Sequence, residues 1–292
     1  MKKYIPVLLI MIALPSCQFS KSVNKNLISG LITKGDGISC EEVYLTVNDE
    51  KTERNIFIYG EVFNLNFSDI NGFEKENEVV FPGMKIVITN SVGDTVLLED
   101  DLYGEYRSGV NLNPLVLISD ITVAAPMASN RAYTLFVEIW DKLGNSSFTA
   151  QFYFTVERDK SILVESNKVS CREIYLFVKE REKVIIGNTL VFDERTYMIF
   201  EGLSGFTEEN DMVFPGLGIK ITDADGLNVV TSEDLFSQYN KSGIPVSDFK
   251  DAVSSNFIIP VSQIKNPLHC EIAIWDKKSD VKIVAKTDLN IK

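Results

Sequence analysis

The sequence ENEVVFPGMKI at residues 76–86 returns almost unchanged as ENDMVFPGLGI at residues 209–219 of a 292-residue chain. Two further phrases repeat in step with it: SCEEVYLTV from Ser39 with SCREIYLFV from Ser170, and EIWDK from Glu138 with IAIWDK from Ile272. A unit of about 120 residues is longer than a solenoid repeat and has the size of an independent domain. The sequence therefore predicts a tandem duplication, with copies at 37–157 and 168–292 and a linker at 158–167.

Apolar residues alternate with polar ones along much of each copy. Because successive side chains of a strand point to opposite faces, this pattern predicts strands with one face on a core. The expected core rows are Val43, Leu45 and Val47; Ile174, Leu176 and Val178; Ile86 and Ile88; Ile219 and Ile221; Leu135, Val137 and Ile139; and Cys270, Ile272 and Ile274. Gly93 and Gly226 lie between apolar runs, where a tight hairpin needs a positive φ angle. One short helix is expected in each copy, in DLYGEY at Asp101 and DLFSQY at Asp234.

These features predict an all-β protein made of two tandem immunoglobulin-like antiparallel β-sandwiches. The repeated FPG is then interpreted as a corner before a strand that enters at a sheet edge. Proline lacks a backbone donor and glycine lacks a Cβ, so both suit a bend. Phe81 and Phe214 are expected to close the end of each core.

The first seventeen residues, MKKYIPVLLIMIALPSC, have the pattern of an export signal. Their apolar run of about eleven residues is too short to cross a bilayer, which takes about 20. The segment LPSC resembles the lipobox of bacterial lipoproteins, in which the cysteine is diacylated and becomes the new N-terminus, although Pro15 departs from the usual small residue. The alternative is an ordinary secretory signal with an incidental cysteine. We expect lipidation at Cys17, followed by a polar tether at 18–36.

With its lipobox and its duplicated pattern, the whole chain resembles uncharacterised Bacteroidetes lipoproteins built from duplicated immunoglobulin-like domains. The resemblance implies a bacterial cell envelope and no particular reaction. Surface-exported lipoproteins of that group carry acidic residues just after the cysteine, whereas QFSKSVNKN here is basic. The sequence therefore favours the periplasmic face of the outer membrane over the cell surface.

The composition limits the classes of partner that are expected for this protein. The formal net charge is −12, and a chain this acidic repels phosphate backbones, so nucleic acid is not expected as a partner. The single histidine, His269, has no counterpart in the first copy and is interpreted as a surface or core residue. Cys40 and Cys171 are equivalent, and Cys270 is expected to be a buried thiol. A bridge between Cys171 and Cys270 is not favoured but stays open.

Three groups of residues are candidate sites. Trp140 and Trp275 stand at equivalent positions and are interpreted as packing residues, with a glycan platform as the alternative. Thr95 lies in DTV, which resembles the acceptor of Bacteroidetes O-glycosylation; an ordinary turn is the alternative. Strand direction gathers acidic residues at one end of each copy, as a rim that is either a solvated surface, a Ca²⁺ site or an attachment point for a basic partner. The rim comprises Glu76, Glu78, Asp101, Asp141, Glu209, Asp211, Asp234 and Asp276, with Glu74, Asp100, Glu208 and Glu233 beside them.

No GxSxG, HExxH or P-loop pattern occurs in the sequence. We therefore predict a lipid-anchored, non-enzymatic binding or assembly module whose sandwich loops contact an envelope protein or a glycan. We expect no cofactor, with Ca²⁺ bound at the acidic rim as the alternative. The alternative is a glycan-processing enzyme or accessory chain with carboxylates that the sequence does not locate.

Overall fold

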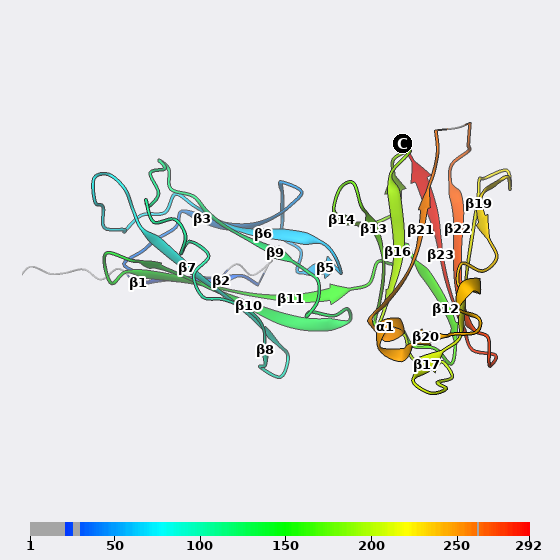
Figure 1. The fold of residues 1–292 in the computed structure, drawn as a ribbon. Helices are drawn as coiled ribbons and strands as arrows, with labels where there is room; N and C mark the ends of the chain where they lie inside the picture. The colour runs from blue at the N-terminus through cyan, green and yellow to red at the C-terminus, as the bar shows by residue number, and fades with distance from the viewer. Residues whose placement is uncertain (1–20, 26–29, 262) are drawn as a thin grey trace, which may run out of the picture.

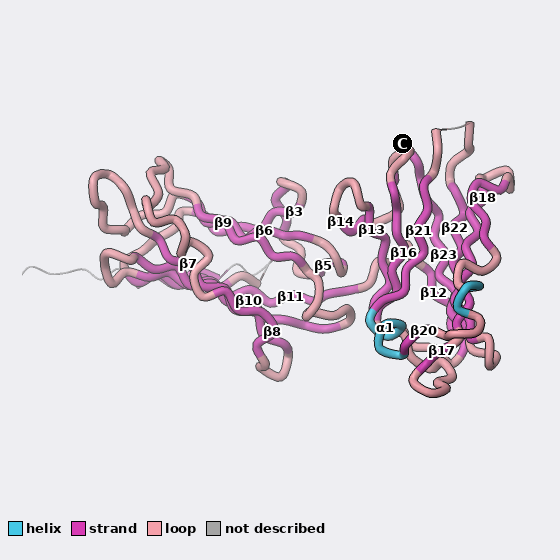
Figure 2. Tube along the Cα trace, viewed as in Figure 1, coloured by secondary structure: helices cyan, strands magenta, loops and turns pink. Residues whose placement is uncertain are grey.

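The computed structural model describes residues 21–25, 30–261 and 263–292. The predicted signal peptide and Cys17 lie outside these residues. The described chain forms two β-sandwiches joined end to side, with strands throughout and little helix (Figures 1 and 2). The predicted all-β fold is confirmed. Along the described residues no helix has both the length and the apolar composition needed to cross a membrane.

The first sandwich packs a large sheet on a smaller one. The large sheet runs in the order β1 (Lys21–Lys25), β2 (Ile32–Asp36), β11 (Ser147–Glu157), β10 (Arg131–Asp141), β7 (Pro82–Asn90) and β8 (Thr95–Glu99), with β5 (Ile56–Ile58) parallel to the end of β11. The small sheet runs β4 (Glu50–Thr52), β3 (Glu42–Val47), β6 (Val62–Ser68) and β9 (Leu117–Thr122). The strands β3, β6 and β9 correspond to A, B and E of an immunoglobulin sandwich, and β5, β11, β10, β7 and β8 correspond to A′, G, F, C and C′.

The second sandwich repeats this strand order, except that β1 has no counterpart in it. Its large sheet runs β12 (Leu163–Asn167), β23 (Lys282–Ile291), β22 (Leu268–Asp276), β18 (Pro215–Thr222) and β19 (Asn228–Ser232), with β15 (Thr189–Leu190) parallel to β23. Its small sheet runs β14 (Lys183–Ile185), β13 (Glu173–Val178), β16 (Arg195–Glu201) and β21 (Ala252–Ile258). Four short elements have no named counterpart in the first copy: the pair β17 (Met212–Val213) and β20 (Ile244–Pro245), the 3₁₀ turn η1 (Ser237–Tyr239) and the helix α1 (Val246–Asp251).

Two separate apolar cores result, one from residues 31–156 and one from residues 162–291. Every residue of the expected rows in β7, β10, β13, β18 and β22 is buried, including Cys270. In β3 only Leu45 is fully buried, while Val43 and Val47 pack against the core from partly exposed positions. Gly93 and Gly226 have the expected positive φ angles of 96° and 84°.

Several sequence-based boundaries differ from the structure. Residues 32–36, expected in the tether, form β2 and pair with β11, and residues 163–167, expected in the linker, form β12 and pair with β23. Both segments are largely polar. β12 is an edge strand, and β2 lies between β11 and the edge strand β1, which also falls within the expected tether, so alternation does not reveal them. The expected helix at Asp101 is a series of turns, and at Asp234 only a 3₁₀ turn, η1 (Ser237–Tyr239), forms.

The FPG corner also differs from expectation. Pro82 and Pro215 are the first residues of β7 and β18, and each of these strands lies between two others, away from the sheet edge. Phe81 and Phe214 are only partly buried and do not close the cores.

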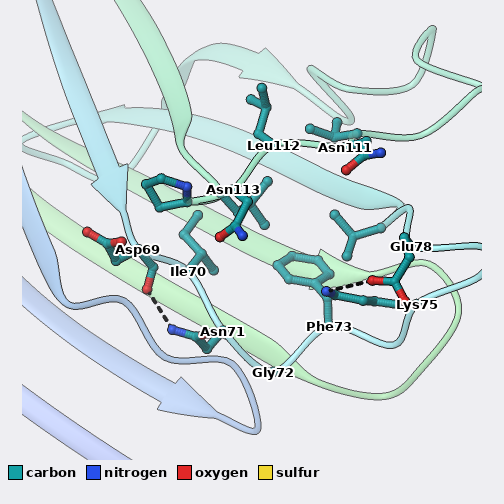
Figure 3. A pocket seen from close by; sticks show the side chains of 14 residues that line it. Asp69, Ile70, Asn71, Gly72, Phe73, Lys75, Glu78, Asn111, Leu112 and Asn113 are labelled. Atoms are coloured by element: carbon teal, nitrogen blue, oxygen red, sulfur yellow. Dashed lines mark hydrogen bonds and ion pairs between the residues drawn. The ribbon is translucent and has the colours of Figure 1, made fainter.

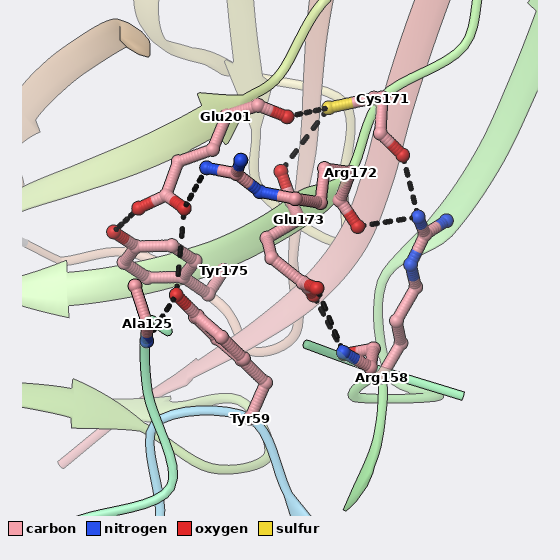
Figure 4. Close-up of polar contacts among 9 residues, drawn as sticks. Tyr59, Ala125, Arg158, Cys171, Arg172, Glu173, Tyr175 and Glu201 are labelled. Atoms are coloured by element: carbon pink, nitrogen blue, oxygen red, sulfur yellow. Dashed lines mark hydrogen bonds and ion pairs between the residues drawn. The ribbon is translucent and has the colours of Figure 1, made fainter. Parts of the chain in front are cut away.

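The two sandwiches meet through a polar and aromatic joint (Figure 4). The buried carboxylate of Glu173 accepts hydrogen bonds from the backbone N–H and the hydroxyl of Ser129, at 2.8 and 2.6 Å. The rings of Tyr59 and Tyr175 lie 5.5 Å apart, and both hydroxyls donate to the carboxylate of Glu201. These contacts use the end of the first sandwich where β10 begins and leave its opposite end free.

Candidate functional site

We call the loop end of each sandwich the end where the β6–β7, β8–β9 and β10–β11 connections, or their counterparts, come together. In the first copy these connections are residues 69–81, 100–116 and 142–146. The pairing of Asp141 with Pro82 and the hydrogen bond from Leu102 N–H to the Met84 carbonyl, at 2.7 Å, bring the three together. In variable immunoglobulin domains the B–C and F–G loops of this end belong to the binding surface.

The two tryptophans explain the glycine of the repeated FPG. Trp140 is paired across the sheet with Gly83, and Trp275 with Gly216. A Cβ atom on either glycine would lie 2.1 Å from Cε2 of the facing indole, so the ring occupies space that only glycine leaves open. This packing accounts for the duplication of both residues. The alternative of a glycan platform stays a prediction.

The aspartate that follows each tryptophan is buried and links the loops of the loop end through hydrogen bonds. Asp141 is 3% exposed and accepts hydrogen bonds from the N–H groups of Glu74 and Leu143, at 2.6 and 3.0 Å. Asp276 is 2% exposed and accepts from Thr207 N–H, Lys278 N–H and Ser279 Oγ, at 2.8, 2.9 and 2.7 Å. Each carboxylate therefore ties the F–G turn to the B–C loop of its own sandwich.

The lysine of each WDK pairs with a second repeated aspartate. Lys142 Nζ lies 2.7 Å from Asp101 Oδ2, and Lys277 Nζ lies 2.6 Å from Asp234 Oδ2. The other carboxylate oxygen of each aspartate accepts a backbone N–H of the neighbouring strand, from Met84 or Leu217, both at 3.2 Å. Four of the eight candidate rim acids thus accept backbone hydrogen bonds inside the protein, and two more, Glu78 and Glu209, form ion pairs with Lys75 and Lys278 at 3.4 and 3.1 Å.

The remaining rim acids lie on a tight turn that is repeated in both copies. Glu78 and Asp211 have positive φ angles, and Glu76 and Glu209 pair across the turn with Val79 and Met212. Within the described ranges, no three His, Cys, Asp or Glu side chains are grouped as metal ligands. The expectation that Asp141 and Asp276 stand on an accessible rim is wrong because both are buried. Calcium binding by the other acids stays a prediction.

Through Asp276, the stability of the second sandwich is expected to depend on pH. Burial alone would raise the pKa of Asp276, but the hydrogen bonds from Thr207, Lys278 and Ser279 outweigh it and hold the pKa below its ordinary value. A carboxylate with a lowered folded-state pKa contributes stability that is complete above the unfolded pKa of about 3.9 and is lost as the pH falls through the folded value.

We therefore expect Asp276→Asn to reduce the free energy of unfolding at pH 7 by about 2 kcal/mol, since one oxygen facing an N–H donor is replaced. Below pH 4 the difference between the variant and the native chain should shrink. Urea unfolding measured at pH 7 and at pH 3 checks this, with Asp288→Asn as an exposed control. A constant difference at both pH values would contradict the assigned role.

The other candidate residues are solvent-facing or packed. Thr95 is exposed beside the β7–β8 hairpin turn, and its glycosylation stays a prediction. His269 is exposed and lies 2.7 Å from Asp288 through Nδ1. Cys40, Cys171 and Cys270 are free thiols, so the bridge between Cys171 and Cys270 does not form. Burial raises the pKa of the Cys270 thiol to about 12, which makes it an unreactive packing residue.

A cavity of about 230 Å³ opens at the loop end of the first sandwich, between the β6–β7 and β8–β9 connections (Figure 3). The Phe73 ring and Val80 form its apolar wall, and Asp69, Asn111 and Asn113 add polar groups. Lys75 and Glu78, 3.4 Å apart, close one side as an ion pair. The side chains of Asp69, Asn111 and Asn113 make no hydrogen bond with any other residue that the structure describes. They are therefore available to a ligand.

The same position of the second sandwich is filled. Phe206 replaces Phe73 and is 8% exposed because Phe249 of α1, itself 2% exposed, packs edge-on against it with ring centroids 4.7 Å apart. Val110 and Ile244 are paired at equivalent positions of the two copies. The connection after them is 111–116 in the first copy and 245–252 in the second. Beyond these segments, β9 and β21 again pair at equivalent positions. Two extra residues in the second copy therefore make the helical turn that covers the phenylalanine.

Sequence reasoning missed this cavity, and the difference in loop length was the signal that pointed to it. The repeats are offset by 133 residues at the FPG and by 135 at the tryptophan. That difference places a two-residue insertion between the two motifs of the second copy, although it does not show which core residue the insertion covers.

No family model and no curated protein matches the chain. Among solved structures, the chain is similar at 10% identity to the fibronectin(III)-like modules of Clostridium thermocellum CbhA, over 85% of this chain and 94% of that one, with a TM-score of 0.20. It is similar at 8% identity to the ICAM-5 D1–D4 ectodomain fragment, over 89% of this chain and 60% of that one, with a TM-score of 0.20. A third, pT26-6p, shares 7% identity over 94% of this chain and 66% of that one, with a TM-score of 0.26. Because these TM-scores are low, the assignment to the immunoglobulin-like class depends on the strand order described above.

Proposed function

We propose that this protein is a lipid-anchored, non-enzymatic binding module of the bacterial cell envelope that contacts a protein or glycan through the loop end of its first sandwich. The immunoglobulin-like fold is compatible with such a role, because sandwich loops are a common binding surface. The observation that carries the proposal is the open cavity of the first copy beside its closed counterpart in the second. A duplicated protein that fills a position in one copy and leaves it open in the other has one copy specialised for contact.

The chain path supports placing this contact near a membrane. Asp36 of β2 pairs with Ser147, next to the β10–β11 connection, and Lys21 of β1 pairs with Asp36. The described chain therefore starts at the loop end of the first sandwich. An extended chain spans at most about 3.6 Å per residue, so a lipidated Cys17 would lie within about 14 Å of Lys21. We propose an outer-membrane anchor, with the periplasmic face favoured over the cell surface, and with the loop end towards the bilayer.

In-cell photo-crosslinking tests the proposal. A photo-reactive residue at Lys75, on the cavity wall of the first sandwich, should form crosslinks to an envelope component in the native host. The same residue at Glu208, the equivalent exposed position of the second sandwich, is the matched control and should form none. Equal crosslink yields at both positions, or no crosslinks at Lys75, would show that the loop end of the first sandwich is not the binding surface.

The anchor is tested in the same cells. Cys17→Ala should move the protein out of the salt-washed membrane fraction, because two acyl chains give stable attachment and the described chain has no spanning helix. It should also reduce the crosslinks from Lys75, since the partner is expected near the membrane. A variant that stays in the membrane fraction would place the anchor elsewhere.

A further inference from the structure

We infer that the cavity of the first sandwich binds one ring of a neutral saccharide. This inference rests on the proposed function and identifies the ligand class of the same loop end. It depends on three properties of the cavity: its size, its charge and the kind of groups that line it.

The size fits a single ring. Pockets for drug-sized ligands occupy about 300–1,000 Å³, and this cavity of about 230 Å³ lies below that range. It therefore holds one compact unit of a longer ligand, with the remainder extending into solvent.

The charge excludes anions. Asp69 and Glu78 contribute two carboxylates, and the single cation, Lys75, is already paired with Glu78. An uncompensated Asp69 repels a phosphate, a sulfate or an acidic sugar, so the ligand is expected to be neutral.

The residues that line the cavity offer hydrogen-bonding groups for the hydroxyls of a saccharide and an apolar surface for its ring. The amides of Asn111 and Asn113 each offer donors and acceptors, and Asp69 offers acceptors, which matches hydroxyls that both donate and accept. The Phe73 ring supplies an apolar surface for the C–H face of a pyranose. The backbone groups of Val80 and Val110 are already used, because these two residues donate to each other's carbonyls at 3.0 and 2.8 Å, so this pair offers no edge for an added peptide strand. The cavity therefore favours a saccharide over an extended peptide.

The test uses the full chain, purified in a detergent whose headgroup is not a sugar. It is applied to an array of neutral, cationic and anionic glycans, and the strongest neutral hit is then titrated by calorimetry. The same glycan is also offered as a glycolipid headgroup in neutral phospholipid vesicles. We expect binding to neutral glycans, with binding in the soluble arm indicating a free saccharide and binding in the vesicle arm alone indicating a membrane-held one.

Variants connect the binding to the cavity. The double variant Asn111→Ala with Asn113→Ala should weaken binding at least tenfold, whereas Asn228→Ala, an exposed asparagine of the second sandwich, should leave it unchanged. Phe73→Leu keeps an apolar side chain and should weaken binding with little change in melting temperature.

Two results would overturn the saccharide inference: no neutral glycan bound in either arm, or binding that the cavity variants do not change. If crosslinks from Lys75 to a protein persist in that case, the proposed binding function stands and only the ligand class is wrong. Absence of both signals would reject the two together.

Discussion

Phe249→Ala is expected to lower the free energy of unfolding of the second sandwich by about 3–5 kcal/mol, the usual range for truncating a buried phenylalanine. The side chain is 2% exposed and packs against Phe206, so its loss removes the apolar contact and leaves a cavity beside a second buried ring. Because α1 spans only Val246–Asp251, too short to be stable by itself, the helix should unfold with it.

The measurement uses urea unfolding followed by tryptophan fluorescence in a Trp140→Phe background, in which Trp275 reports on the second sandwich alone. Leu163→Ala, a change at a 65% exposed position of β12 in the same sandwich, serves as the control and should cost less than about 1 kcal/mol. A loss below 1 kcal/mol for Phe249→Ala would show that α1 does not hold the core, and the contrast between the two sandwiches would then have no energetic basis.

Much of the fold follows from local patterns. The alternating rows in β7, β10, β18 and β22 predicted buried strand faces because burial of one face sets a period of two, and each of those residues is buried. Gly93 and Gly226 predicted hairpins because few other residues adopt a positive φ angle at low cost. These features depend on neighbours in the sequence and can be recognised without the structure.

Features that depend on distant partners could not be predicted in the same way. The polar segments of β2 and β12 are strands only because β11 and β23 offer them backbone partners. Strand direction did bring the acids of the rim to one end, but it could not show that Asp141 accepts a hydrogen bond from Glu74 N–H, 67 residues away in the chain. A carboxylate that accepts hydrogen bonds in this way has a structural role and is buried inside the sandwich.

The repeated phrase is explained by these distant contacts. Gly83 is required by Trp140, and Lys142 is paired with Asp101, so FPG, DL and WDK form one set of interacting residues in each sandwich. The sequence showed that the three motifs recur together. The structure supplies the reason, because a substitution in one motif disturbs its partner in another.

The candidate site lies at a position where the two copies differ. Comparison of the repeats in the sequence reveals the residues that the copies share, so it does not reveal this position. Phe73 and Phe206 are aligned and look equivalent in sequence, yet Phe73 borders a cavity whereas Phe206 is covered by Phe249. The cause is the length of the connection after Val110, which is two residues shorter than its counterpart after Ile244.

We propose that this shorter connection leaves the first sandwich open for binding. Exchanging residues 111–116 for the sequence of 245–252, PVSDFKDA, should place a phenylalanine over Phe73 and fill the cavity. Lengthening a loop by two residues costs well under 0.6 kcal/mol in closure entropy, so the first sandwich should stay folded. The reciprocal exchange should open the second sandwich without a gain of binding, because Gly202 and Ser204 stand where the first copy has Asp69 and Asn71.

The decisive measurement is the yield of in-cell crosslinks from Lys75, which lies outside the exchanged segment, in the native chain and in the chain carrying the exchange. Circular dichroism melts of both chains establish that the exchange leaves the fold intact. We expect the crosslinks to fall at least tenfold while the melting temperature changes by only a few degrees. Crosslinks that persist at the native yield in a folded, closed first sandwich would contradict this proposal.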